Sequence, residues 1–188
     1  MFYTKDELLE KGFLSVGNNT KVSKLASLYL SEGSSIGSNV RIDDFTIIKG
    51  NIEIENNVHI SSFCSLNGTG SKITLRNYVG ISTHCGLFTA IEDFIKPTLM
   101  SPAINKEFSK ISRQSEIFFD EASKVGSNCT FLPGVNIGYG ASIGANSVIF
   151  ENIEDGAIVG PKHRGIKIYG FRDLEEIKQM QSNYEKNN

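Results

Sequence analysis

Residues Val125–Ile149 read Val-Gly-Ser-Asn-Cys-Thr, Phe-Leu-Pro-Gly-Val-Asn, Ile-Gly-Tyr-Gly-Ala-Ser and Ile-Gly-Ala-Asn-Ser-Val, followed by Ile149. A large apolar residue recurs at every sixth position. Asn or Gly stands three places after it, and a small or β-branched residue stands four places after it. A period of six predicts a β-solenoid, in which each hexad forms one short strand and one turn. Asn and Gly suit the turn because they adopt positive φ at little cost.

The same period runs through the first half of the chain. Its apolar positions are Leu30, Ile36, Ile42, Ile48, Ile54, Ile60 and Leu66. Earlier matches at Val16 and Val22 precede a slip of two residues near Leu28. A slip of three residues at Gly68-Thr69-Gly70 predicts a bulge at a corner, after which Leu75, Ile81 and Leu87 resume the register.

The repeat divides the 188 residues into the parts of a single domain. Residues 1–15 form a lead-in, in which Thr4 and Glu7 predict a capped helix. Residues 16–87 and 119–150 form the coils, and residues 88–118 form a long inserted loop without the period, which is typical of a functional segment. Residues 151–188 form a C-terminal extension. Its apolar residues recur every three or four positions, which predicts one amphipathic helix that caps the open end of the solenoid.

Composition excludes several classes of protein. The formal charge of −2 and the pI near 5.9 argue against nucleic acid or an acidic membrane surface as the main partner. No apolar run is long enough to span a bilayer and no signal-peptide pattern is visible, so a cytoplasmic location is expected. The three cysteines, Cys64, Cys85 and Cys129, occupy the small inward place of their hexads, which predicts buried, packed thiols.

This repeat resembles that of the hexapeptide-repeat acyltransferases. The resemblance implies an all-β fold, a left-handed parallel β-helix with three hexads per coil, and a homotrimer that transfers an acetyl group from acetyl-CoA without a metal. The runs Arg41-Ile42-Asp43-Asp44-Phe45, His59-Ile60 and Glu92-Asp93-Phe94 look like a branch of sugar acetyltransferases from surface-polysaccharide pathways such as lipopolysaccharide biosynthesis. That branch implies a sugar acceptor, either a nucleotide-linked amino sugar or a sugar hydroxyl.

Stacking of coils converts the sequence phase into columns of side chains. With three hexads per coil, each residue lies about 4.8 Å above its equivalent in the coil below. One outer patch then gathers four columns: Arg41, His59 and Gly80; Asp43, Ser61 and Ser82; Asp44, Ser62 and Thr83; Phe45, Phe63 and His84. The inserted loop with Glu92 and Asp93 leaves the coils a few residues later.

This patch suits acyl transfer, which needs a base to take a proton from the acceptor. His59, on a strand and beside Asp43, is the preferred base, and His84, at a turn, competes with it. Galactoside acetyltransferases carry their catalytic His in the loop, where this chain has Glu92 or Asp93, so the base is expected to come from elsewhere in the chain. Asp93 is a further catalytic candidate. Arg41, Asp43, Asp44 and Glu92 are the candidate substrate-binding residues. Alternatively, the histidines lie on a plain solenoid surface and the carboxylates are solvated turn residues.

The resemblance also implies a groove for the pantetheine arm between adjacent subunits, along the last coils. Small residues let such an arm approach the backbone closely, and the candidates are Gly134, Gly140, Gly144 and Ala145. Lys162 and Arg164 resemble in position the segment that holds the CoA phosphates. A solvated basic turn is the competing interpretation.

Two other functions remain open at this point. A non-catalytic solenoid scaffold would need neither the inserted loop nor the polar patch. A metal enzyme of the carbonic anhydrase type would need three imidazoles on zinc, and the third histidine, His163, follows the last repeat.

Overall fold

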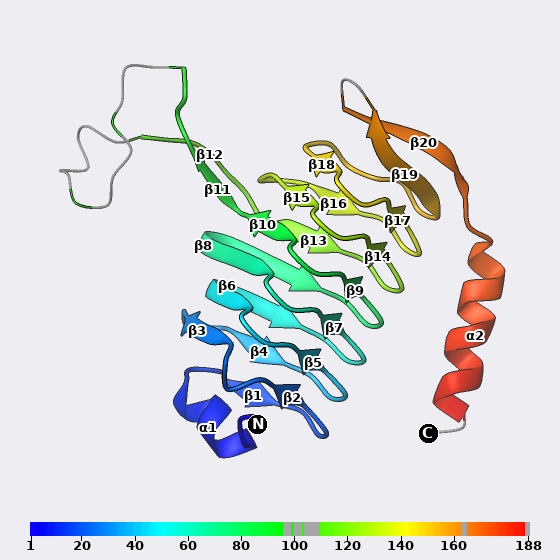
Figure 1. Ribbon diagram of the computed structural model, residues 1–188. Coiled ribbons are helices and arrows are strands. Elements are labelled where there is room, and N and C mark those ends of the chain that lie inside the picture. The colour runs from blue at the N-terminus through cyan, green and yellow to red at the C-terminus, as the bar shows by residue number, and fades with distance from the viewer. Residues whose placement is uncertain (96–98, 100–102, 104–109, 163–164, 187–188) are drawn as a thin grey trace.

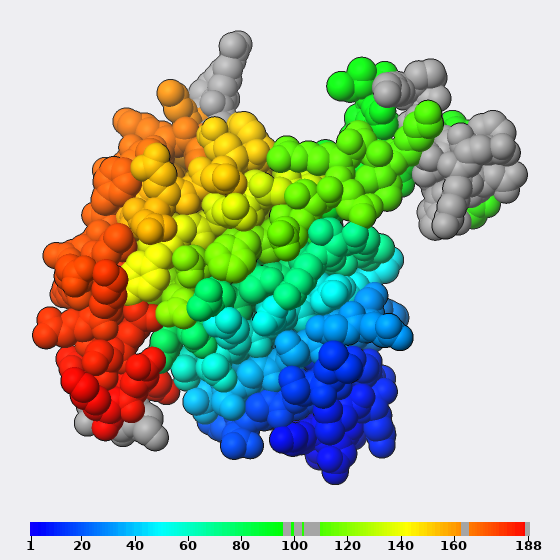
Figure 2. All heavy atoms as spheres, turned by 180° about the vertical axis from the view of Figure 1, so that it is seen from behind, coloured from blue at the N-terminus to red at the C-terminus, as the bar shows by residue number. Residues whose placement is uncertain are grey.

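The computed structural model describes residues 1–95, 99, 103, 110–162 and 165–186. Short parallel strands wind around a triangular prism, and the coils are stacked in chain order (Figures 1 and 2). This confirms the predicted left-handed parallel β-helix. A C-terminal helix, α2 (Leu174–Lys186), lies beside it.

Each face of the prism is one parallel ladder. The first face contains β1 (Ser15–Val16), β4 (Ser35–Ile36), the second half of β6 (Ile47–Ile54) and of β8 (Ser65–Leu75), β13 (Ile117–Phe119) and β16 (Asn136–Ile137). The second face contains β2 (Lys21–Val22), β5 (Arg41–Ile42), β7 (His59–Ile60), β9 (Gly80–Ile81), β14 (Lys124–Val125), β17 (Ser142–Ile143) and β19 (Ala157–Lys162). The third face contains β3 (Ser27–Leu30), the first halves of β6 and β8, β10 (Gly86–Phe88), β15 (Thr130–Phe131) and β18 (Val148–Ile149).

The apolar residues of the hexads form one continuous core inside the prism. Ile42, Ile60 and Leu66 are fully buried, and the rings of Phe119 and Phe131 pack edge to face with their centroids 4.9 Å apart. Burial of such side chains is the main source of stability in a fold whose strands contain only two residues in most places. The bulge after Gly68 is confirmed, because the register to β6 shifts by three residues there.

In the described part of the chain, the positive-φ residues other than glycine lie at two corners of the prism. The first corner joins the first face to the second, and it has positive φ at Asn19, Asn39, Asn57, Tyr78, Ala122 and Gly140. The second corner joins the second face to the third, and it has positive φ at Phe45, Phe63, His84, Asn128 and Asn146. Asn therefore fills the turn as expected, while aromatic residues in the left-handed region carry a backbone cost that the stacked coils must offset.

The three cysteines are free and buried, as predicted. The hydrogen bond with Cys85 lowers the pKa of Cys64. For Cys85 a hydrogen bond with Cys129 lowers the pKa, but the bond with Cys64 and burial outweigh it and raise the pKa to about 11. A buried thiol with a raised pKa behaves as a small hydrophobe.

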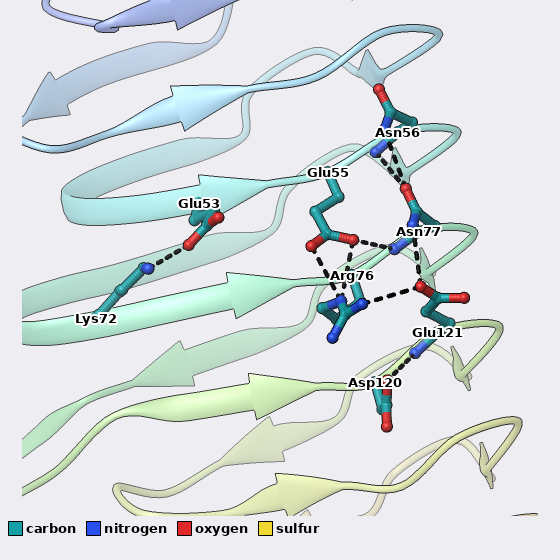
Figure 3. A network of polar contacts seen from close by, with 8 residues as sticks. All are labelled: Glu53, Glu55, Asn56, Lys72, Arg76, Asn77, Asp120 and Glu121. Atoms are coloured by element: carbon teal, nitrogen blue, oxygen red, sulfur yellow. Dashed lines mark hydrogen bonds and ion pairs between the residues drawn. The ribbon is translucent and has the colours of Figure 1, made fainter.

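On the outer surface of the first face, a network of ion pairs and hydrogen bonds links neighbouring coils (Figure 3). The Arg76 guanidinium lies 3.0 Å from a carboxylate oxygen of Glu55 and 3.1 Å from one of Glu121. Asn77 donates to Glu121 at 3.0 Å, and Lys72 pairs with Glu53 nearby. The hydrogen bond to Glu55 raises the pKa of Arg76. Because these groups come from neighbouring coils, the network supports their register.

The N-terminal helix α1 (Lys5–Glu10) is present with its capping box, in which the Thr4 hydroxyl accepts from the Glu7 backbone and the Glu7 carboxylate accepts from the Thr4 backbone. The prediction that Leu30 is the apolar position of its hexad is wrong, because Leu28 stacks on the apolar position Ile48 and Leu30 stacks on Gly50. The slip of two residues therefore lies after Leu28.

The upper end of the solenoid differs from the prediction. The repeat was expected to stop at Ile149, but Ile153 pairs with Ile137 and Val159 pairs with Ile143, which adds to the coils. The step from Ile149 to Ile153 is four residues, so the six-residue count misses it. The chain then turns back as β20 (Gly165–Phe171), antiparallel to β19.

The role predicted for α2 as a cap on the open end is wrong. The helix runs along the first corner, back toward the first coils (Figure 1). The Tyr78 hydroxyl donates to Glu185 at 2.8 Å and Tyr139 bonds to Gln181, both across this contact. Since β20 already covers the free edge of β19, the helix can pack against the side of the prism.

The insert is an antiparallel ribbon where it leaves the coils, with β11 (Ala90–Glu92) paired to β12 (Ile111–Gln114). Its prolines, Pro97 and Pro102, lie outside the described residues. The ribbon projects from the third-face side of the prism (Figure 1). No helix in the described part of the chain is long and apolar enough to cross a membrane.

Candidate active site

The outward side of the second face carries a single column of side chains. Ladder register places Arg41 beside His59, His59 beside Gly80, Gly80 beside Lys124 and Lys124 beside Ser142. The predicted column of Arg41, His59 and Gly80 is therefore present. Its strands contain two residues each, so the position of each side chain is determined by the coil above and below.

His59 and Arg41 both contact the carboxylate of Asp43. His59 Nε2 lies 2.8 Å from Asp43 Oδ2, and Arg41 Nε lies 2.7 Å from Asp43 Oδ1. The Asp43 side chain is 19% exposed, against 50% for His59. Burial alone would raise the pKa of Asp43, but the hydrogen bonds from His59 and Arg41 outweigh it and lower the pKa. The carboxylate thus stays ionised and orients the imidazole.

The tautomer of His59 follows from this contact. An ionised carboxylate only accepts hydrogen bonds, so Nε2 carries the proton that it donates to Asp43. Nδ1 is left with a free lone pair, which is the arrangement of a general base. Asp44 takes no part in this pair; it accepts a hydrogen bond from the Ser23 hydroxyl of the coil below.

His84 lies at the second corner, with φ 61°. Its ring stacks on Phe63 at 5.0 Å between centroids, and Phe63 stacks on Phe45 at 5.1 Å. The Thr83 hydroxyl lies 2.8 Å from His84 Nδ1. His84 is therefore held by aromatic stacking and by its neighbour, and no carboxylate among the described residues bonds to it as Asp43 bonds to His59.

A groove of about 680 Å³ follows the second face from His59 to Tyr169. The residues that form its floor differ from one end to the other. Ser61 and Ser82 line the part near His59, and Gly126, Gly144 and Gly160 line the part near Tyr169. A Cβ at Gly160 would come within 2.9 Å of the Tyr169 ring, so this glycine is needed where the hairpin of β19 and β20 approaches the groove.

The predicted cofactor residues are not brought together. Gly144 lines the groove, and Ala145 follows it in the chain. Gly134 lies next to Arg113 and Ser115 of the insert, and Gly140 lies under Ile177 of α2, so neither reaches the groove. Successive hexads face three different sides, which separates them. Lys162 is exposed at the end of β19, and Arg164 lies outside the described residues.

Several groove residues were missed by the sequence analysis. Gly126 and Gly160 occupy the hexad place of Gly144 on neighbouring coils, which the register could have indicated. Lys124 stands in the column of His59 and could have been found the same way. Tyr169 enters through the antiparallel hairpin, for which the repeat gives no signal.

The insert does not bring Glu92 and Asp93 to His59 within one chain. Glu92 ends β11, and its Oε2 is buried without a hydrogen-bond partner in the described part of the structure. The Asp93 backbone N–H donates to the Lys110 carbonyl across the ribbon at 2.8 Å. Neither residue lines the groove. The described residues contain no group of three or more His, Cys, Asp or Glu side chains that could hold a metal ion.

Comparison with known proteins identifies the family. Residues 33–68 match the family of bacterial transferase hexapeptide repeats (six repeats). The dTDP-4-amino-4,6-dideoxy-D-glucose acyltransferase of Escherichia coli is 36% identical over 151 residues, which cover 79% of this chain and 78% of the relative.

Solved structures give the same result. An aspartate-to-alanine variant of AntD, an N-acyltransferase from Bacillus cereus, in complex with dTDP and coenzyme A, is 31% identical, with a TM-score of 0.90 over 100% of this chain and 98% of AntD. AntD in complex with dTDP and 3-hydroxybutyryl-CoA is 31% identical, with a TM-score of 0.90 over 99% of this chain and 97% of AntD. The chain belongs to the hexapeptide-repeat acyltransferases.

Proposed function

We propose that this enzyme transfers an acyl group from a CoA thioester to the amino group of a dTDP-linked amino sugar. The observation that carries the proposal is the His59–Asp43 pair at one end of a groove with a glycine floor. The relatives named above act on, or bind, a dTDP-amino sugar or dTDP together with CoA. Acetyl-CoA is the proposed donor, and assembly of a cell-surface polysaccharide in the cytoplasm is the proposed setting.

The glycine end of the groove suits the donor. An extended pantetheine arm can lie against Gly126, Gly144 and Gly160, because the backbone there carries no side chains. The arm then ends toward Ser82 with its thioester near His59. At the other end Lys162 and Lys167 of the hairpin offer cations to the CoA phosphates.

The transfer proceeds by attack of the amine nitrogen on the thioester carbonyl. His59 Nδ1 takes the proton that the nitrogen loses as the nitrogen–carbon bond forms. The carbon–sulfur bond then breaks, the amide is released, and the departing CoA sulfur receives the proton from the imidazole. Asp43 stabilises the imidazolium in between, and Arg41 holds Asp43 from the other side.

The remaining candidates take secondary roles in this proposal. Arg41 and Asp44 would contact the acceptor of their own chain, and Glu92 would contact the acceptor bound by a neighbouring subunit. His84 and Asp93 are alternative bases, and Asp93 could serve a neighbouring subunit, because the ribbon projects away from its own prism (Figure 1).

A homotrimer is proposed from the apolar surface at the second corner. Leu25, Phe45 and Phe63 are each more than half exposed, and Ile47 beside them is 45% exposed. An exposed apolar stripe of this kind marks an interaction site, and it lies next to His59 and His84. We expect sedimentation equilibrium at micromolar concentration to give three times the chain mass, and Phe63→Asp to lower it. A monomeric wild-type protein would contradict the proposal.

A direct assay tests the activity. Incubation with acetyl-CoA and dTDP-4-amino-4,6-dideoxyglucose is expected to yield the N-acetylated nucleotide sugar, detected by mass spectrometry. The control acceptor is dTDP-glucose, which offers only hydroxyls and is expected to remain unmodified. Acetylation of dTDP-glucose alone would show an O-acetyltransferase, and no product from either would contradict the proposed reaction.

A further inference from the structure

A second cavity lies between α2 and the first corner of the prism. Its volume is about 570 Å³. Figure 1 shows α2 running beside the coils that carry β5, β7 and β9. The cavity is lined by Asn39, Asn57, Tyr78, Gly80, Ala122, Lys124, Arg172, Ile177, Met180, Gln181 and Tyr184.

Among the described residues, the lining contains two cations, Lys124 and Arg172, and no carboxylate. Lys124 is exposed, and it forms no ion pair within the described residues. Arg172 Nη1 donates to the carbonyl oxygens of Ala122 and Gly140 at 3.1 and 2.9 Å, which leaves its charge unneutralised by these contacts. Glu185 lies outside the lining and accepts from the Tyr78 hydroxyl. This charge balance favours an anionic ligand.

The rest of the lining suits a flat polar ring. Tyr78 and Tyr184 pack edge to face with centroids 6.0 Å apart, and Met180 is 55% exposed beside them. Asn57 and Gln181 add side-chain amides, which can both donate and accept hydrogen bonds. Aromatic faces with amide groups and cations together match a nucleoside diphosphate.

The cavity joins the groove at Gly80 and Lys124, which line both. A Cβ at Gly80 would meet nothing within 4 Å, so this glycine leaves open space on the column. Lys124 lies two coils from His59, which is about 10 Å. A ligand in the cavity can therefore extend past Gly80 toward the base.

We propose that this cavity binds the nucleoside diphosphate of the acceptor, with the base against Tyr184 and Met180 and the diphosphate at Lys124. The sugar then passes over Gly80 and presents its amine to His59. This inference rests on the proposed function. CoA also contains a nucleoside diphosphate, but its arm leads along the glycine floor toward the hairpin, so the acceptor is the assigned occupant.

Calorimetric titration with dTDP and, separately, with CoA tests the assignment. Lys124→Met removes the cation and Met180→Glu places a carboxylate at an exposed position of the lining, so neither disturbs the core. Each is expected to weaken dTDP binding by about tenfold or more. Met180 lines the cavity and not the groove, so Met180→Glu is also expected to leave CoA affinity unchanged. Lys21→Met, in the same column but outside both cavities, and Lys178→Met, paired with Glu175 on α2, are the matched controls and should bind dTDP like wild type.

The outcomes separate the two proposals. Wild-type protein that binds CoA but not dTDP would overturn the proposed acceptor class together with this site. Wild-type protein that binds dTDP, with both variants equal to it, would overturn the site alone. Loss of CoA affinity with dTDP binding intact would overturn the assignment to the acceptor.

Discussion

Replacing His59 with alanine is expected to lower turnover by about 10²–10⁴-fold, because the amine would lose the base that accepts its proton. Acetyl-CoA affinity should change little, because the glycines proposed to hold the pantetheine arm lie toward the other end of the groove from His59 and its partner Asp43. Steady-state kinetics with the dTDP-amino sugar, together with CoA titration, measures both quantities.

Two further measurements make this test specific. Asp43→Asn should keep the packing but lower turnover, since the neutral amide no longer stabilises the imidazolium. His84→Asn suits the positive φ of that corner and should cost far less. A large loss from His84→Asn with most activity retained by His59→Ala would exclude His59 as the base.

Replacing Phe131 with alanine is expected to destabilise the fold by about 3–5 kcal/mol. Phe131 is fully buried on β15, between Leu87 and Ile149 of the neighbouring strands, and its ring packs against Phe119. Truncation leaves a cavity that the coils above and below cannot fill without losing their register. Urea unfolding followed by circular dichroism measures the change.

Phe94→Ala is the matched control. Phe94 is 78% exposed, so the same truncation removes little buried surface and should change the unfolding free energy by no more than about 0.5 kcal/mol. Equal effects from both substitutions would contradict the assigned core, as would a Phe131→Ala protein as stable as wild type.

The sequence by itself determined the coils and most of the site's geometry. In a parallel solenoid each residue stacks on its equivalent one coil away, so the register follows from counting residues along the hexads. Arg41, His59 and Gly80 therefore had to share a column. Asp43 follows in the next outward place of its coil, which puts its carboxylate within reach of His59. The buried cysteines follow from the same phase.

The hexad phase also shows why Gly134 and Gly140 do not line the groove that one chain forms. They stand in consecutive hexads, which face different sides of the prism, and only Gly144 belongs to the hexad on the second face. Counting hexads for the glycines in the way used for His59 would have identified Gly126 and Gly160, which stack on Gly144, as the other glycines of the groove.

Only the tertiary structure decided how the second face is enclosed. Ile153 joins the coils across a shortened step, β20 turns back antiparallel to β19, and Tyr169 reaches the groove through that hairpin. The docking of α2 along the first corner creates the cavity that contains Met180 and Tyr184. These contacts join segments distant in sequence through side-chain packing and antiparallel pairing, which have no period, so the hexapeptide repeat carries no information about them.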